Sequence, residues 1–156
     1  MNLRHLKDFG IGLGFVALQI VLFRHLKIYE MQADLVLIYL IWYMTQRDRT
    51  TAIVMAALLG FFQDAFLDLW GLNMFSKTLI VFSAFNIIPK TKEIRLLLGQ
   101  VFLSILLIAL AHNLVYLGLN SLVEQYSPEL MFWRQLAGNS IYTAIVGSFI
   151  YLFRTS

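Results

Sequence analysis

Residues 60–77 read Gly60-Phe-Phe-Gln63-Asp64-Ala-Phe-Leu-Asp68-Leu-Trp-Gly71-Leu-Asn73-Met-Phe-Ser-Lys77. This segment places ionisable and amide side chains inside a chain that is otherwise strongly apolar. An ionisable group within a membrane segment costs roughly 2.5–3.5 kcal/mol on insertion scales, so such groups normally face protein or water and have a use. We therefore look for function in this segment first.

The rest of the 156-residue chain has the composition of an integral membrane protein. Hydrophobic residues make up 60% and charged residues 13%, and the mean hydropathy is +0.74, whereas soluble domains are about 45–50% apolar and about 25% charged. Apolar runs cover nearly the whole length, which predicts a single transmembrane domain over residues 1–156. The chain has no cysteine, and its three histidines show no metal spacing. We expect no cofactor and no bound metal.

Six transmembrane helices in a compact all-α bundle are predicted. A helix needs about 20 residues to cross about 30 Å of hydrocarbon, and fewer if flanking side chains reach the surface. The spans are expected at about 9–23, 34–44, 51–67, 73–88, 94–119 and 132–153. The second is the shortest, and in a five-helix alternative it lies flat or re-entrant.

The distribution of basic residues predicts the orientation of this bundle. With six helices, one side carries Arg4, Lys7, Arg47, Arg49, Lys90, Lys92, Arg95 and Arg154, and the other carries Arg24, Lys27 and Arg134. The positive-inside rule places the first set, and both termini, in the cytoplasm. It disfavours the five-helix alternative, which would move the cluster at 90–95 outside. Because Lys and Arg mainly set orientation here, we expect contact with the lipid bilayer and no binding to nucleic acid.

The polar side chains of the opening segment follow a helical spacing. A glycine and two carboxylates recur every four residues on the third predicted helix, and Asn73 and Lys77 repeat the spacing on the fourth. A turn near Gly71 brings the two stripes together at the outer membrane surface and predicts an Asp64–Lys77 ion pair. The predicted polar hairpin comprises Gly60, Gln63, Asp64, Asp68, Gly71, Asn73 and Lys77.

Two functional interpretations of the hairpin carboxylates stay open beside this structural one. Two carboxylates can do acid–base catalysis, but here both lie on one helix and a lysine can pair with one of them. Asp64 could instead serve the path of a transported cation or proton. The chain has no phosphate-binding loop, dinucleotide fingerprint, zinc helix or serine elbow, so we do not expect an enzyme.

Other helices carry polar or small residues suited to packing. Gly10 and Gly14 form a small-residue face on the first predicted helix that would admit another helix, inside the bundle or from a second protein. Polar residues in the last two predicted helices are expected to hydrogen-bond between helices rather than to bind metal. These residues are His112, Asn113, Asn139 and Ser140.

Three segments resemble the rod shape-determining protein MreD family. They are Gln32-Ala-Asp34-Leu-Val-Leu-Ile, the loop Arg47-Asp-Arg49, and residues 60–77 with their Gly-(x)2-Gln-Asp and Gly-Leu-Asn-(x)3-Lys elements. Family members typically have proline where Ala33 stands here. They have small residues where this chain has Phe66 to Trp70, so Asp68 has no family assignment.

The resemblance implies a non-enzymatic scaffold of the bacterial cell-elongation complex in the inner membrane. Such a scaffold binds an MreC-like single-pass membrane protein, belongs to a complex with MreB, RodA and a penicillin-binding transpeptidase, and helps organise peptidoglycan synthesis and cell shape. The implied fold is similar to that of the substrate-binding subunits of energy-coupling-factor transporters. The alternative function is therefore a substrate-binding membrane subunit of a vitamin or metal transporter, which a polar pocket opening outward would favour.

Overall fold

The computed structural model describes residues 3–25, 31–88, 97–123 and 129–155, without the side chains of 22–24, 129, 154 and 155. These residues form six helices, which confirms the predicted all-helical fold. The helices are α1 (Leu3–His25), α2 (Leu35–Met44), α3 (Arg49–Leu67), α4 (Leu72–Ala84), α5 (Leu98–Val123) and α6 (Glu129–Thr155). Three of them, α3, α5 and α6, contain segments long and apolar enough to cross a membrane.

Helix bounds differ from the predicted spans mainly at the ends. The fourth helix stops at Ala84 rather than at residue 88, because the N–H groups of Ile87 and Ile88 both turn back to the carbonyl of Ala84. The first helix begins at Leu3, two turns earlier than predicted. The basic residues Lys27, Lys90, Lys92 and Arg95 lie outside the described residues, as do the side chains of Arg24 and Arg154.

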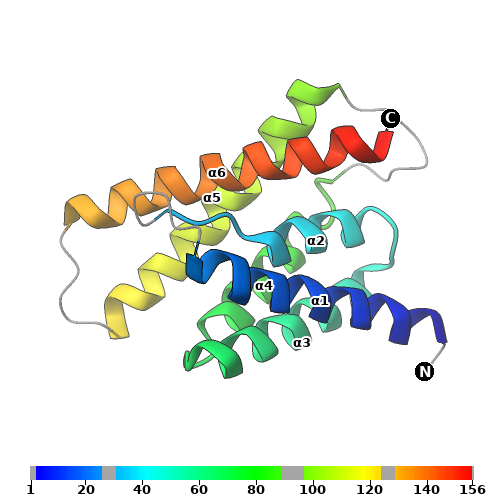
Figure 1. Cartoon of the computed structure of the whole chain (residues 1–156), viewed down its shortest axis with the longest axis horizontal. Helices are drawn as coiled ribbons and strands as arrows, with labels where there is room; N and C mark the ends of the chain where they lie inside the picture. The colour runs from blue at the N-terminus through cyan, green and yellow to red at the C-terminus, as the bar shows by residue number, and fades with distance from the viewer. Residues whose placement is uncertain (1–2, 26–30, 89–96, 124–128, 156) are drawn as a thin grey trace.

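Helix α2 is the centre of the bundle and packs against all five other helices. Figure 1 shows it between α1 and α6, with the N- and C-terminal ends of the chain at one end of the molecule and the α3–α4 turn at the other. The N-terminal end of α2 and the C-terminal end of α1 also lie toward the end that carries the α3–α4 turn. Functional side chains near these three places can therefore meet.

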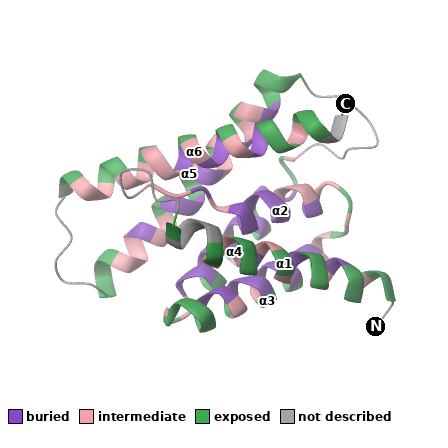
Figure 2. Ribbon diagram, viewed as in Figure 1, coloured by how far each residue is buried: buried purple, intermediate pink, exposed green. Residues whose placement is uncertain are grey.

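The sequence of α2, Leu-Val-Leu-Ile-Tyr-Leu-Ile-Trp-Tyr-Met, explains its central position. A helix that is hydrophobic on every side is stable only when protein or lipid surrounds it completely, and residues 35–40, Tyr43 and Met44 are all buried (Figure 2). Its 10 residues span only about 15 Å, which is half the thickness of the hydrocarbon layer. The segment that leads into α2 is partly covered by protein, with Ala33 fully buried.

Large apolar side chains cover the outer faces of the other helices. Soluble monomers rarely expose contiguous apolar patches above a few hundred Å², so this surface suits lipid and agrees with the hydropathy of α3, α5 and α6. Figure 2 shows these outer faces as exposed. The exposed side chains include Val21, Val54, Leu58, Phe61, Phe75, Phe82, Leu103, Leu107, Ile145 and Phe149.

The glycines of α1 differ in what surrounds them. A Cβ atom at Gly12 would lie 2.8 Å from Cδ1 of Leu59 and 3.1 Å from Cε1 of Tyr39, so this glycine allows α1 to approach α2 and α3 closely. A Cβ atom at Gly10 or Gly14 would meet nothing within 4 Å. Of the two alternatives left open for Gly10 and Gly14, the described residues disfavour a partner helix inside the bundle, because the helix turns Gly12 inward instead.

Candidate functional site

An extended segment, Met31–Asp34, precedes α2 and takes its hydrogen bonds from α6. The N–H of Gln32 donates to Oδ1 of Asn139 at 2.9 Å, and the N–H of Asp34 donates to Oγ1 of Thr143 at 3.0 Å. Non-helical backbone at membrane depth is tolerated only where it is buried in protein or lines a cavity. The polar side chains of α6 therefore allow this segment to stay non-helical, because they satisfy its N–H groups.

The first turn of α2 is completed by side chains as well. Its first N–H groups have no partner within the helix. Gln19 on α1 accepts from the N–H of Val36 at 3.0 Å, and Asp34 caps the helix by accepting from the N–H of Leu37 at 2.9 Å. Three separate segments, α1, α6 and the N-cap itself, thus satisfy the backbone around the start of α2.

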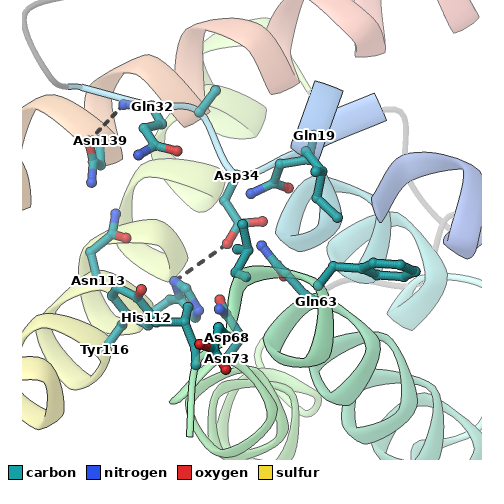
Figure 3. A pocket seen from close by; sticks show the side chains of 15 residues that line it. Gln19, Gln32, Asp34, Gln63, Asp68, Asn73, His112, Asn113, Tyr116 and Asn139 are labelled. Atoms are coloured by element: carbon teal, nitrogen blue, oxygen red, sulfur yellow. Dashed lines mark hydrogen bonds and ion pairs between the residues drawn. The ribbon is translucent and has the colours of Figure 1, made fainter. Parts of the chain in front are cut away.

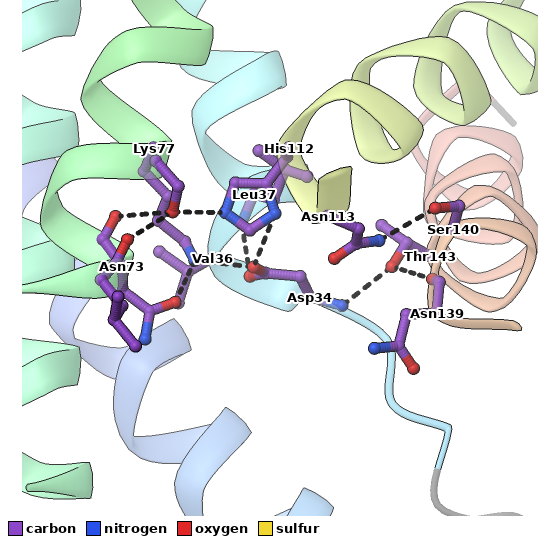
Figure 4. Close-up of polar contacts among 12 residues, drawn as sticks. Asp34, Val36, Leu37, Asn73, Lys77, His112, Asn113, Asn139, Ser140 and Thr143 are labelled. Atoms are coloured by element: carbon purple, nitrogen blue, oxygen red, sulfur yellow. Dashed lines mark hydrogen bonds and ion pairs between the residues drawn. The ribbon is translucent and has the colours of Figure 1, made fainter. Parts of the chain in front are cut away.

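Lys77 forms its ion pair with Asp34, not with Asp64 as predicted from the helical spacing. Its Nζ lies 2.6 Å from Oδ2 of Asp34 and 2.9 Å from Oδ1 of Asn73, and the lysine side chain is fully buried (Figure 4). The prediction was wrong because the start of α2, far away in sequence, brings a second carboxylate to the same place.

Asp64 instead caps α4 from the neighbouring helix. Its two carboxylate oxygens accept from the N–H groups of Asn73 at 3.0 Å and Met74 at 2.9 Å, and also from Nδ2 of Asn73 at 3.0 Å. The N-cap position of α4 is Gly71, which offers no side-chain oxygen. Asp64 thus places its negative charge at the positive end of α4, which neutralises it locally.

Gly60 lets α3 and α4 come together at this cap. A Cβ atom there would lie 2.5 Å from Cα of Met74, a contact that no side chain can make. The turn that follows needs two left-handed residues, Asp68 with φ 56° and Gly71 with φ 82°. Asp68 ends α3 through its backbone, whose N–H donates to the carbonyl of Asp64, and its side chain is exposed.

Three of the four predicted polar residues of α5 and α6 contact another helix, while Asn139 bonds to the segment before α2. Nδ2 of Asn113 donates to Oγ of Ser140 at 2.9 Å, which ties α5 to α6. His112 contacts α4, because its Nε2 lies 3.2 Å from Oγ of Ser76. Oγ of Ser76 also donates to the carbonyl of Leu72 at 2.6 Å within its own helix.

A cavity of about 560 Å³ opens among these groups (Figure 3). Buried polar side chains form its base, while Phe66, Leu67 and Asp68 on its lining are exposed and belong to its rim. The polar lining comprises Gln19, Gln32, Asp34, Gln63, Asp68, Asn73, His112, Asn113, Tyr116 and Asn139. Most of the predicted polar residues therefore line one cavity, together with residues that the sequence did not single out.

Sequence reasoning missed Gln19 and Thr143 altogether, and it gave Gln32 and Asp34 no role in the site, although both belong to a segment that carries the family resemblance. One signal was available for Asp34, because an aspartate directly before an apolar run is a favoured helix N-cap. The roles of Gln19 and Thr143 leave no such trace, since they serve backbone groups that only the folded chain brings near.

The chemistry of the site is that of polar recognition. Asp34 is neutralised by Lys77, and Asp64 by the end of α4, so the base of the cavity presents mainly carboxamide, imidazole and phenol groups. Within the described residues, no group of three or more His, Cys, Asp or Glu side chains is placed to hold a metal ion.

Comparisons with protein-family models, with curated proteins and with solved structures found no match for this chain.

Proposed function

We propose that this protein is a non-enzymatic membrane scaffold of the bacterial cell-elongation complex. It crosses the inner membrane six times with both termini in the cytoplasm and binds an MreC-like partner, through which it helps organise peptidoglycan synthesis by a complex with MreB, RodA and a penicillin-binding transpeptidase. The family resemblance supplies these expectations, and the arrangement of the resembling segments supports them.

The observation that carries the proposal is that the resembling segments interlock. Asp34 pairs with Lys77, Asp64 caps the Gly-Leu-Asn turn through Asn73, and Gly60 gives that turn its room. Residues that define a family through their mutual contacts are expected to hold a shared architecture rather than to perform chemistry. A rigid polar junction of this kind suits a scaffold that presents fixed helix faces to a partner.

The face of Gly10 and Gly14 on α1 is our expected contact for the partner's transmembrane helix. No described residue occupies the space beside either glycine, and small residues let two helix backbones approach closely in lipid. Co-purification of a tagged chain with an MreC-like protein tests the proposal. Replacing Gly10 and Gly14 by Leu should lower recovery of the partner about tenfold, whereas Gly118→Leu on α5, also at an open position, should not.

Deletion in a rod-shaped bacterium provides the cellular test. Loss of rod shape, restored by the wild-type chain, is the expected result. Normal cell shape after deletion, or failure to recover any partner under mild solubilisation, would contradict the scaffold.

The cavity favours a second candidate, a substrate-binding membrane subunit of a small-molecule transporter. A polar cavity of about 560 Å³ at one end of the bundle is the size of a typical ligand site, and the proposed orientation places it on the outer side. Mass spectrometry of an organic extract of the purified protein tests this candidate. A vitamin-like molecule in stoichiometric amount, with no MreC-like partner, would favour the transporter over the scaffold.

A further inference from the structure

Two buried polar atoms of the cavity have no hydrogen-bond partner among the described residues. Gln63 is 2% exposed, yet its Oε1 meets no donor. Nδ1 of His112, a residue also 2% exposed, has no hydrogen-bond partner either, and a carboxylate oxygen of Asp34 lies 3.9 Å away. Leaving such a group unsatisfied is costly, and folded proteins contain few of them. Both residues line the cavity (Figure 3), so an occupant is positioned to supply the missing hydrogen bonds.

The rest of the lining indicates the charge of that occupant. No Lys or Arg lines the cavity in the described part of the chain, and the buried Nζ of Lys77 is already held by Asp34 and Asn73. An anionic group such as phosphate would therefore meet no available cation. Asp34 is paired with the same lysine, so the base offers no free carboxylate to an ammonium group, and the carboxylate of Asp68 lies at the exposed rim instead.

Carboxamides dominate what remains. Each can both donate and accept, as a hydroxyl group can, and a cluster of them suits a ligand with several hydroxyls. The carboxamide side chains are Gln19, Gln32, Gln63, Asn73, Asn113 and Asn139. Tyr116 adds a phenol, and its ring stacks on that of His112 with centroids 6.1 Å apart.

The rim of the cavity carries large apolar side chains beside the carboxylate of Asp68, whereas the base is lined by buried polar groups. Phe66 is 67% exposed and Leu67 is 44% exposed, and both belong to the cavity lining. This difference in polarity between base and rim fits an amphiphile whose headgroup enters the base while its chains stay in the bilayer. A free polar molecule could also occupy the base.

We propose that the cavity binds an uncharged polyhydroxyl group, whose hydroxyls donate to Oε1 of Gln63 and form a hydrogen bond with Nδ1 of His112. The group belongs either to a sugar-bearing lipid or to a free sugar. The inference rests on the cavity alone and goes beyond the scaffold proposal, because it holds whether or not the chain binds an MreC-like protein.

Thermal unfolding of the full chain in phosphatidylcholine nanodiscs, followed by tryptophan fluorescence, tests this. One arm adds glucosyl diacylglycerol, with plain diacylglycerol as its control; the other adds glucose or sucrose, with choline and inorganic phosphate as controls. A sugar-bearing probe at 100 times its dissociation constant should raise the unfolding temperature by about 5 °C or more. A shift with the glycolipid alone identifies a lipid headgroup, and a shift with the free sugars identifies a soluble ligand.

Gln63→Leu separates ligand binding from folding. The variant should weaken sugar binding about tenfold. Because it removes a buried acceptor that has no partner, it should also raise the unfolding temperature of the ligand-free protein by about 2–4 °C. The matched control is Gln19→Leu, which removes the acceptor of the Val36 N–H and should lower that temperature.

Three results would overturn the proposal. They are the absence of a shift with every sugar-bearing probe, an equal shift with choline or phosphate, and unchanged sugar affinity in Gln63→Leu. None of them bears on recovery of the MreC-like partner, so the scaffold stands or falls separately.

Discussion

Lys77 shows how one buried charge organises its surroundings. Its ammonium group is fully buried and contacts Asp34 and Asn73. Breaking a buried ion pair from one side is strongly destabilising, by about 3–5 kcal/mol, because the other charge is left uncompensated. The contribution of Lys77 to stability therefore depends on its ion-pair partner, and experiment can identify that partner.

Double-mutant cycles should couple Lys77 to Asp34 and much less to Asp64. Lys77→Met alone should lower the free energy of unfolding by about 3–5 kcal/mol. The double variant Lys77→Met with Asp34→Asn should lose far less than the sum of the losses in the two single variants. In the cycle of Lys77→Met with Asp64→Asn, the two losses should add to within about 0.5 kcal/mol. Any coupling that remains would pass through Asn73, which contacts both residues. Chemical unfolding in detergent micelles measures both cycles. Stronger coupling of Lys77 to Asp64 would restore the ion pair predicted from helical spacing.

Gly60 should tolerate no side chain. The methyl group of Gly60→Ala would overlap the backbone of Met74, and overpacking of this kind costs about 1–3 kcal/mol. The same change at Gly14, where a Cβ atom meets nothing, should be neutral or stabilising by up to about 1 kcal/mol, since alanine favours helix. The unfolding temperatures of the two variants, measured side by side, make the comparison. Equal changes in the two would contradict a close contact between α3 and α4 at Gly60.

At the scale of the element, helix ends decide the stability of α3 and α4. Asp48 caps α3, accepting from the hydroxyl of Thr51 at 2.7 Å and from its N–H at 3.0 Å. Asp64 caps α4 from a neighbouring helix. The Asp48 cap is local in sequence and lies in an exposed loop, while the Asp64 cap depends on the packing of α3 against α4. The stability that the exposed cap contributes should therefore depend more on pH than that of the buried one.

The cap of α3 should weaken in acid. The hydroxyl and then the N–H of Thr51 hold the pKa of Asp48 below its usual value of 3.8. A group whose pKa is lowered by folding stabilises the protein above its unfolded pKa and loses that contribution as the pH falls through the folded pKa. Asp48→Ala should cost about 1 kcal/mol at pH 7, and this cost should become smaller as the pH falls below the unfolded pKa and through the lowered folded pKa. A pH series of unfolding for wild type and variant measures the difference, and a cost independent of pH would contradict the carboxylate cap.

Sequence reasoning could predict the helices and the polar stripes but not how the stripes are paired. Apolar runs and helical spacing are local, so they identify α3, α4 and the position of Lys77 on one face. The partner of Lys77 is 43 residues away, and its arrival depends on α2 entering the bundle. For the same reason spacing identified glycines on α1 but could not tell that Gly12 faces inward.

At the scale of the whole molecule, α6 supports the backbone in front of α2. Thr143→Val keeps the shape of the side chain and removes the acceptor of the Asp34 N–H, which should cost about 1–3 kcal/mol. The control Thr78→Val removes an exposed hydroxyl that bonds only within its own helix and should change stability by less than about 0.5 kcal/mol. Unfolding of both variants in one detergent gives the answer, and equal stability would mean that the segment does not need α6.

The bonds from Met31–Asp34 to α6 also set an order of assembly. Gln32 and Asp34 reach partners that lie 107 and 109 residues later in the chain. Proteins are made from the N-terminus at about 5–20 residues per second, so α2 is synthesised several seconds before the α6 side chains that bond the segment in front of it. During that interval its first backbone groups lack their partners from α6. Folding around the start of α2 can therefore finish only after α6 has been synthesised. A chain truncated before α6 should be degraded by the cell's proteases, because these backbone groups stay without partners.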